Sequence, residues 1–109
     1  ALQLFGSTAR ALNMEPVLMT QATAGLRPKY GHSSKRFATM VSRHGLINQA
    51  TREMAARKGI FINDLSANFA RMPDRASLFY DFVHFNEDGS RRIAQIVSRA
   101  IANRIRGSE

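Results

Sequence analysis

The chain has 109 residues, of which 44% are hydrophobic and 22% are charged, a composition typical of a folded domain and too apolar for a disordered chain. This length allows one domain with one modest core. No apolar run approaches the roughly 20 residues that a membrane helix needs, so no membrane span is expected. The absence of cysteine excludes a disulfide scaffold, a zinc finger and a thiol nucleophile, but it leaves the compartment open.

The net charge of +8 is concentrated in the first part of the chain. Residues 1–60 carry nine basic and two acidic side chains, whereas residues 61–109 carry seven basic and six acidic ones. A positive field raises the local concentration of anions. Nucleic acid, an acidic membrane surface and an acidic substrate are therefore the classes of partner that the charge favours.

The first half of the chain alternates helical and strand patterns. Apolar residues at three- and four-residue spacing predict an opening helix with one buried face, which ends near Asn13. They are Leu2, Phe5, Ala9 and Leu12. The apolar run at residues 16–20 predicts a buried strand. Residues 21–44 have mostly the character of a loop; their second part has helical spacing, and Gly45 is expected to kink or end that helix.

The second half continues the alternation. Residues 46–58 predict a helix that ends at Gly59. Residues 60–62 predict a second buried strand, and residues 65–70 predict a short helix. Asn86 is the expected N-cap of a last helix. The buried stripe of that helix is expected to consist of Ile93, Ile96, Val97, Ala100, Ile101 and Ile105.

Strands that alternate with helices indicate an α/β fold with a parallel sheet. Two strands alone do not make such a sheet stable, because each open strand edge needs a neighbour. The helical pattern also begins with the first residues of the chain. We therefore expect residues 1–109 to be part of a larger domain.

The residues most informative about function lie just before the last helix. Asp81 and His84 are three positions apart in the segment Asp81-Phe82-Val83-His84-Phe85-Asn86. In a turn, a carboxylate at this spacing can bind one imidazole nitrogen, which fixes the tautomer and leaves the other nitrogen as a general base. This arrangement is the lower half of a Ser–His–Asp system. Val83 and Phe85, on either side of the histidine, are expected to anchor the turn in the core.

The segment 81–86, with Gly89 after it, resembles the last motif block of the SGNH (GDSL-type) hydrolases. These proteins are serine esterases and lipases with a flavodoxin-like, three-layer α/β/α sandwich, and an Asp-x-x-His block before the final helix supplies two members of their triad. Residues 16–20 are similar to the penultimate core strand of the family, and residues 60–65 to its last strand. The resemblance covers most of the chain, but only the last block is specific.

This resemblance implies that residues 1–109 are the C-terminal half of a single SGNH domain, with His84 as the base and Asp81 as its orienter. It implies hydrolysis of carboxylic esters, acetylated glycans among them, with no cofactor and no metal. The Gly-Asp-Ser segment that carries the family's nucleophile does not occur here, nor does the Gly-x-Asn-Asp block of the oxyanion hole. The expected partner is therefore the protein's own N-terminal half, and the chain alone is expected to be inactive.

Other interpretations of the same residues stay open. Asp81 and His84 also fit a capping pair at a helix start, and together with Glu87 and Asp88 they would form only a weak zinc set. The serines available as nucleophiles have the character of cap and turn residues. They are Ser66, Ser77 and Ser90. For the whole chain, the alternatives are a basic module that binds an anionic polymer such as nucleic acid, and an SGNH-like fold used only for binding.

Nucleic acid is not the expected partner, because no aromatic residue is interleaved with the arginines of the last helix. The basic residues of the 21–36 loop are expected to overhang the reaction site, since ligands of open α/β sheets bind beyond the carboxyl ends of the strands. They are Arg27, Lys29, Lys35 and Arg36. Gly25 and Gly31 would let this loop move as a lid. Its charge favours an acidic substrate, and a merely solvated loop is the alternative.

Overall fold

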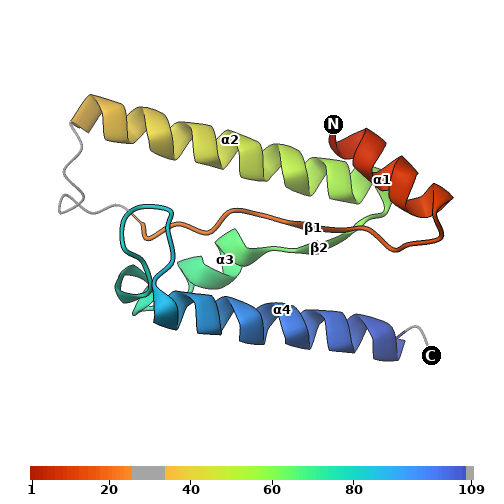
Figure 1. Ribbon diagram of the computed structural model, residues 1–109. Coiled ribbons are helices and arrows are strands. Elements are labelled where there is room, and N and C mark those ends of the chain that lie inside the picture. The colour runs from red at the N-terminus through yellow and green to blue at the C-terminus, as the bar shows by residue number, and fades with distance from the viewer. Residues whose placement is uncertain (26–33, 108–109) are drawn as a thin grey trace. The chain divides into compact units, whose positions relative to one another are not determined.

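The structure, a computed structural model, describes residues 1–25 and 34–107 (Figure 1). It is a mixed α/β chain in which helices predominate and two parallel strands form the sheet. The helices and strands, in chain order, are α1 (Leu2–Ala11), β1 (Val17–Met19), α2 (Ser34–Lys58), β2 (Phe61–Asn63), α3 (Leu65–Ala70), a 3₁₀ turn (Arg75–Leu78) and α4 (Glu87–Gly107). The order of elements confirms the predicted alternation of strands and helices.

The described residues form two compact units. The first unit contains residues 1–21 and 34–66, and the second contains residues 22–25 and 67–107. Within the part of the chain that the structure describes, no helix is long and apolar enough to cross a membrane.

The sheet of the first unit consists of β1 and β2, which run parallel with Leu18 opposite Ile62. Its core contains Leu18, Ala55 and Ile60, which are all buried. Three half-buried residues pack against this cluster: Leu2, Met54 and Ile62. One face of the sheet is thereby covered by α1 and by the second half of α2.

The helix α1 approaches this core through Gly6 as well as through Leu2. A Cβ atom on Gly6 would lie 2.8 Å from Cδ1 of Ile60, so a larger residue there would force the Ile60 side chain to shift. The predicted buried face of α1 is therefore wrong in part: Leu2 packs against the core, but Phe5 and Leu12 are exposed. The apolar spacing of α1 predicts the helix but not its contact.

Hydrogen bonds tie the carboxyl ends of the two strands together. Asp64 accepts the Thr20 hydroxyl at 2.7 Å and pairs with Arg52, whose Nε lies 2.7 Å from the carboxylate. The backbone N–H of Ser66 donates to the Thr20 hydroxyl oxygen at 2.8 Å, so the chain leaving β2 bonds to the chain leaving β1. Each group in this cluster has a partner, which favours a structural role for Asp64.

The long helix α2 differs from the prediction. Its 25 residues run without a break from Ser34 to Lys58 and include Gly45, although the sequence indicates mostly loop before residue 44 and a kink at Gly45. A single glycine in an exposed helix interior costs about 1 kcal/mol, which the other residues of a long helix can offset. The predicted stop at Gly59 is confirmed, because this residue has a φ of +60° and the next N–H bonds back to Ala55.

Aromatic rings form the centre of the second unit. Phe69, in α3, is fully buried, and its ring meets those of Phe79 and Phe85 with centroids 5.8 and 5.4 Å away. Both contacts are edge-on, the geometry that the quadrupoles of aromatic rings prefer. The helix α4 follows directly, as the sequence predicts, but its apolar stripe is only half-buried, and Ile101 and Ile105 are exposed.

The segment 22–25 belongs to this second unit and is hydrogen-bonded to it. The N–H of Ala24 donates to the Phe82 carbonyl at 2.9 Å, and Nε of Arg75 donates to the Ala24 carbonyl at 3.3 Å. Gly25 is buried with a φ of +90°, and a Cβ atom there would lie 2.2 Å from the Arg75 guanidinium. Gly25 is thus packed against Arg75 in this structure; that it lets the segment move as a lid stays a prediction, and Gly31 lies outside the described residues.

The glycine in the middle of α2 allows a direct test of the uninterrupted helix. Gly45→Ala is expected to stabilise the protein by about 0.5–1 kcal/mol, because alanine loses less backbone freedom in a helix and no atom lies within 4 Å of the new Cβ. Gly59→Ala is the control and is expected to destabilise, because of its positive φ. Denaturant unfolding measures both, and a destabilised Gly45→Ala variant would show that the helix is broken there.

Candidate functional site

The segment between the 3₁₀ turn and α4 forms a small closed loop. Its ends are joined by an antiparallel bridge between Phe79 and Phe85, and the N–H of Tyr80 donates to the His84 carbonyl at 2.7 Å. The intervening residues 81–84 therefore project from a fixed base.

Asp81 organises this projecting turn. Its Oδ1 accepts the backbone N–H groups of Val83 at 2.9 Å and of His84 at 2.8 Å. Its Oδ2 lies 2.7 Å from Nδ1 of the His84 ring. One carboxylate oxygen thus shapes the turn while the other orients the imidazole. The structure brings together the two residues that the sequence predicts as a pair.

These hydrogen bonds favour the ionised carboxylate. They lower the pKa of Asp81 from its ordinary 3.8 to about 2, with the Val83 N–H contributing most, followed by the His84 N–H and the His84 ring. The aspartate is therefore negatively charged at any physiological pH. With Nδ1 held as the donor, the neutral ring would carry its lone pair on Nε2.

The ring of His84 is accessible. Its side chain is 74% exposed and that of Asp81 is 49% exposed. Within residues 1–25 and 34–107, the ring forms no hydrogen bond besides the one to Asp81. An exposed, oriented imidazole can exchange protons with a group brought to it, which is the chemistry of a general base.

Asp81 and His84 are not the cap of the following helix. Asn86 caps α4, with its Oδ1 accepting the Gly89 N–H at 2.9 Å while its Nδ2 donates to the Ser77 carbonyl at 2.7 Å. The predicted N-cap is therefore confirmed, and the capping interpretation of the Asp–His pair is wrong. The interior anchor of the turn is Phe82, which is buried, whereas Val83 and Phe85 are half-buried.

Gly89 is required by a close backbone contact that spacing alone does not reveal. A Cβ atom at this position would lie 2.1 Å from the Leu78 carbonyl oxygen and 3.0 Å from the Phe85 ring. The same carbonyl accepts the Asn86 N–H at 3.0 Å, so the start of α4 is pressed against the 3₁₀ turn. Asn86 and Gly89 thereby position the base of the loop that carries Asp81 and His84.

The other candidate residues do not join this pair. The Ser77 hydroxyl donates to the Asp74 carbonyl at 2.7 Å, as expected of a turn residue, and Ser90 lies in the first turn of α4. Glu87 and Asp88 pair with Arg91 instead of facing the histidine. Among the residues that the structure describes, no three His, Asp or Glu side chains gather as metal ligands.

The predicted basic loop is only partly described. Arg27 and Lys29 lie outside the described residues, whereas Lys35 and Arg36 belong to the first turn of α2. The prediction of a loop is therefore wrong for Lys35 and Arg36, which are held on a helix with Arg43 and His44 further along it. That these residues select an acidic substrate stays a prediction.

Gly89→Ala tests the close packing beneath the site. The variant is expected to lose about 1–3 kcal/mol of stability, the usual cost of forcing an atom into a packed site, because the new Cβ meets a backbone oxygen that cannot rotate away. Gly107→Ala is the control, since nothing lies within 4 Å of that position. Equal stability of the two variants in thermal unfolding would contradict the contact.

The lowered pKa of Asp81 predicts a pH dependence of stability. The ionised carboxylate stabilises the folded state above about pH 4, and this contribution is lost as the pH falls through about 2. Because the group is half-exposed, its loss in Asp81→Asn should cost only about 0.5–1 kcal/mol at neutral pH. The difference from the wild type should vanish below about pH 2. Asp88→Asn serves as the control, and a pH-independent difference for Asp81→Asn would overturn the assignment.

The chain matches no protein-family model, no curated protein and no solved structure. The candidate site therefore rests on the geometry of Asp81 and His84 and on the segment that holds them.

Proposed function

We propose that this chain is the C-terminal half of an SGNH-type serine ester hydrolase and supplies the base and the orienting aspartate of its triad. The observation that carries the proposal is the 2.7 Å contact between the Asp81 carboxylate and Nδ1 of an exposed His84. The helix–strand alternation and the parallel pairing of β1 with β2 are compatible with one part of a flavodoxin-like sandwich.

In the proposed reaction His84 acts as the general base. Asp81 fixes the tautomer with hydrogen on Nδ1, so that Nε2 accepts the proton of a serine hydroxyl as the serine oxygen attacks the ester carbonyl. The imidazolium then gives this proton to the departing alcohol, and an acyl-serine remains. Water attacks the acyl-serine with the same base, which releases the acid and regenerates the serine.

The serine and the oxyanion hole would come from the N-terminal half of the domain. Ser77 and Ser90 are engaged in a turn and in the start of α4, which makes them poor nucleophiles for His84. The acyl acceptor in this proposal is water, and the substrate is a carboxylic ester such as an acetylated glycan. No cofactor takes part.

A second proposal is that the chain is a non-catalytic basic module that binds an anionic polymer. The +8 charge and the cationic first half of α2 favour it. An SGNH-like fold that only binds its ligand would combine both features. The two non-catalytic proposals predict that His84 can be replaced without loss of function.

Replacement of His84 in the complete protein, with the N-terminal half present, decides between these proposals. His84→Ala is expected to lower the turnover of p-nitrophenyl acetate by about 10³-fold or more, because the serine loses its base. Asp81→Asn should cost about 10²–10⁴-fold through loss of the oriented tautomer. The 109-residue chain alone should show no activity above its His84→Ala variant.

Controls of the same unit keep this test specific. Gln95→Ala and Asp88→Asn change exposed side chains on α4 and should retain full turnover. Circular dichroism and thermal unfolding of each variant establish that the fold is intact. Full activity of a folded His84→Ala protein would exclude the hydrolase proposal and favour a binding function.

A further inference from the structure

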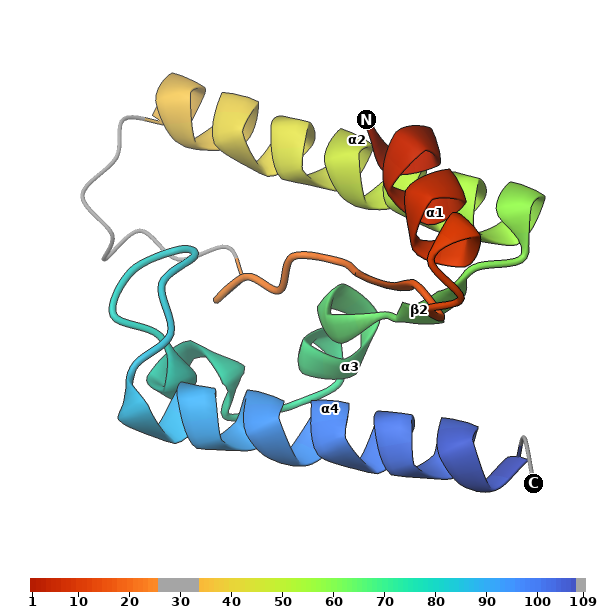
Figure 2. The ribbon, with the colours of Figure 1, turned by 45° about the vertical axis from the view of Figure 1, so that its right-hand side comes forward.

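The first half of α2 projects beyond the strands that its second half covers. Among its described side chains, only Asn48, Thr51 and Ala55 are buried. Asn48 also forms two hydrogen bonds with the backbone of Gln21, just after the end of β1. Its Oδ1 accepts the Gln21 N–H at 2.8 Å, and its Nδ2 donates to the Gln21 carbonyl at 2.9 Å. Residues 35–47 therefore extend roughly 20 Å past the carboxyl ends of β1 and β2, at about 1.5 Å per residue (Figures 1 and 2).

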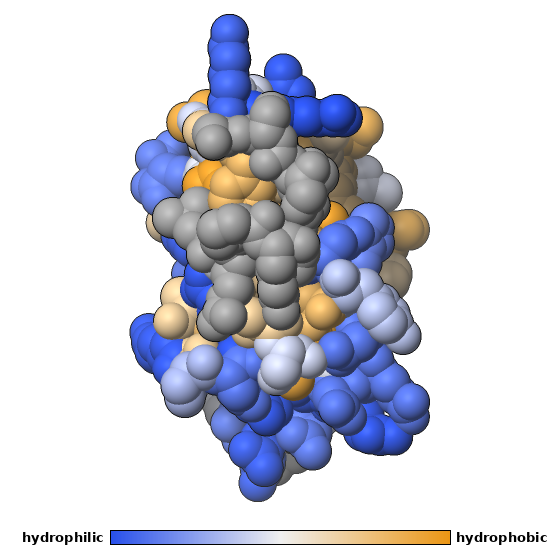
Figure 3. Space-filling model, turned by 90° about the vertical axis from the view of Figure 1, so that its left-hand side faces the viewer, coloured by the Kyte–Doolittle hydropathy of each residue, from blue (hydrophilic) through white to orange (hydrophobic). Residues whose placement is uncertain are grey.

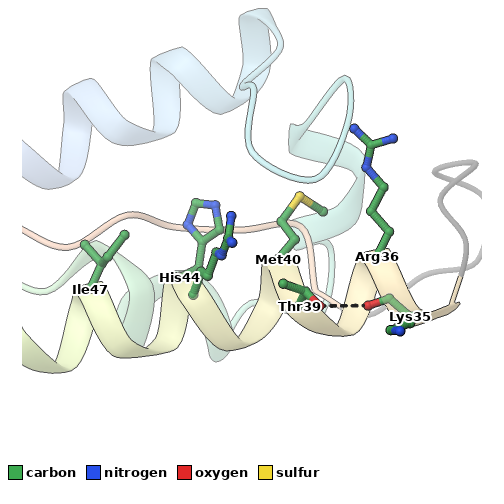
Figure 4. A pocket seen from close by; sticks show the side chains of 7 residues that line it. Lys35, Arg36, Thr39, Met40, His44 and Ile47 are labelled. Carbon is green, nitrogen blue, oxygen red and sulfur yellow. Dashed lines mark hydrogen bonds between the residues drawn. The ribbon is translucent and has the colours of Figure 1, made fainter.

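This projecting part of the helix carries a pocket of about 690 Å³. Its lining residues recur at three- and four-residue spacing along α2: Lys35, Arg36, Thr39, Met40, Arg43, His44 and Ile47. Figure 4 shows Arg36, Met40, His44 and Ile47 rising from the same side of the helix. One turn further on, the same side contains Asn48 and Thr51, which are buried. The pocket thus continues the inward-facing stripe of α2 beyond the sheet.

The charged residues that the structure describes in the pocket lining are all basic. No acidic side chain occurs between Glu15 and Glu53, so the helix offers its own cations no carboxylate in this region. Arg36 and His44 already interact with other groups of the chain. Lys35 and Arg43 form no ion pair within the described residues, and they lie about 12 Å apart along the helix axis with flexible stems that can converge on one anion.

The apolar part of the described lining consists of Met40 and Ile47. Met40 lies between Lys35 and Arg43 along the helix. Ile47, which is 61% exposed, is the last of the lining residues along α2. The Thr39 hydroxyl donates to the Lys35 carbonyl at 3.0 Å, so it is satisfied by its own helix (Figure 4). On the side of the molecule where α2 begins, hydrophilic atoms cover most of the described surface and hydrophobic atoms show between them (Figure 3). The described lining of the pocket thus combines cations with apolar atoms.

We propose that this pocket binds a small amphiphilic anion, whose acidic group is held by Lys35 and Arg43 while its apolar chain lies on Met40 and Ile47. The volume is in the range of small-molecule sites, which are mostly apolar with a few placed charges. Its position beyond the carboxyl ends of parallel strands is where open α/β sheets bind ligands. Among the lining residues that the structure describes, none is aromatic, which disfavours a nucleic acid as the occupant.

The probe for this site is decanoate, titrated below its micelle concentration into the 109-residue chain and followed by calorimetry. Saturable binding is expected, and it should weaken as salt rises, because salt screens the attraction between exposed charges. Lys35→Gln combined with Arg43→Gln should weaken binding about threefold to tenfold, the effect of two exposed charges. Arg57→Gln removes a charge at the other end of the same helix and should leave the affinity unchanged.

Two further probes separate charge from apolar contact. Octyl glucoside has an apolar chain without charge, and acetate has the charge without the chain; both are expected to bind at least tenfold more weakly than decanoate. Met40→Gln combined with Ile47→Thr should weaken the binding of decanoate and leave the weak affinity for acetate unchanged. Absence of saturable decanoate binding, or equal binding of octyl glucoside or acetate, would overturn the proposal. Because no ester is cleaved in this experiment, its outcome is independent of the hydrolase proposal.

Discussion

The candidate site depends on one carboxylate, that of Asp81, whose two oxygens have different tasks. Oδ1 accepts two backbone N–H groups and so determines the shape of the turn, while Oδ2 orients the His84 ring at 2.7 Å. The two tasks reinforce each other, because the turn that Oδ1 builds is what brings His84 back to Oδ2. Loss of the negative charge would weaken all three bonds together, since bonds to an ionised acceptor are the strong ones. The depressed pKa of Asp81 expresses the same coupling.

The turn that carries Asp81 and His84 keeps its shape because its base is tightly packed. This packing comes from residues outside the Asp81–His84 pair. Asn86 ties the start of α4 to the Ser77 carbonyl, and Gly89 lets the helix backbone meet the Leu78 carbonyl. The Phe69, Phe79 and Phe85 rings fill the space beneath. Asparagine and glycine in this segment are thus explained by packing and capping alone. Their presence identifies a loop geometry, whereas the proposed chemistry depends on the aspartate and the histidine.

Local patterns predicted most of the elements, because helix caps, stops and short apolar runs act over a few residues. The strand at residues 16–20, the stop at Gly59 and the cap at Asn86 all follow from such signals. The Asp81–His84 pairing was also predictable, since it needs only three residues of spacing. Contacts between distant segments were not: Gly6 of α1 lies against Ile60, and Gly25 lies against Arg75. No pattern within either segment carries that information.

The most consequential difference between prediction and structure concerns α2. In a short stretch of sequence, a glycine and a run of basic residues are typical of a loop. The 25-residue helix can nevertheless include Gly45, because its second half is held by Ala55 in the core and by the hydrogen bond of Asn48 to Gln21. Helix formation then propagates from that fixed half at little cost per residue. Lys35 and Arg43 consequently occupy set positions on one side of a rod instead of sampling a mobile chain. The basic side chains are thereby arranged along a row of apolar residues, and in the proposed site this order would let the pocket discriminate between anions by shape as well as by charge.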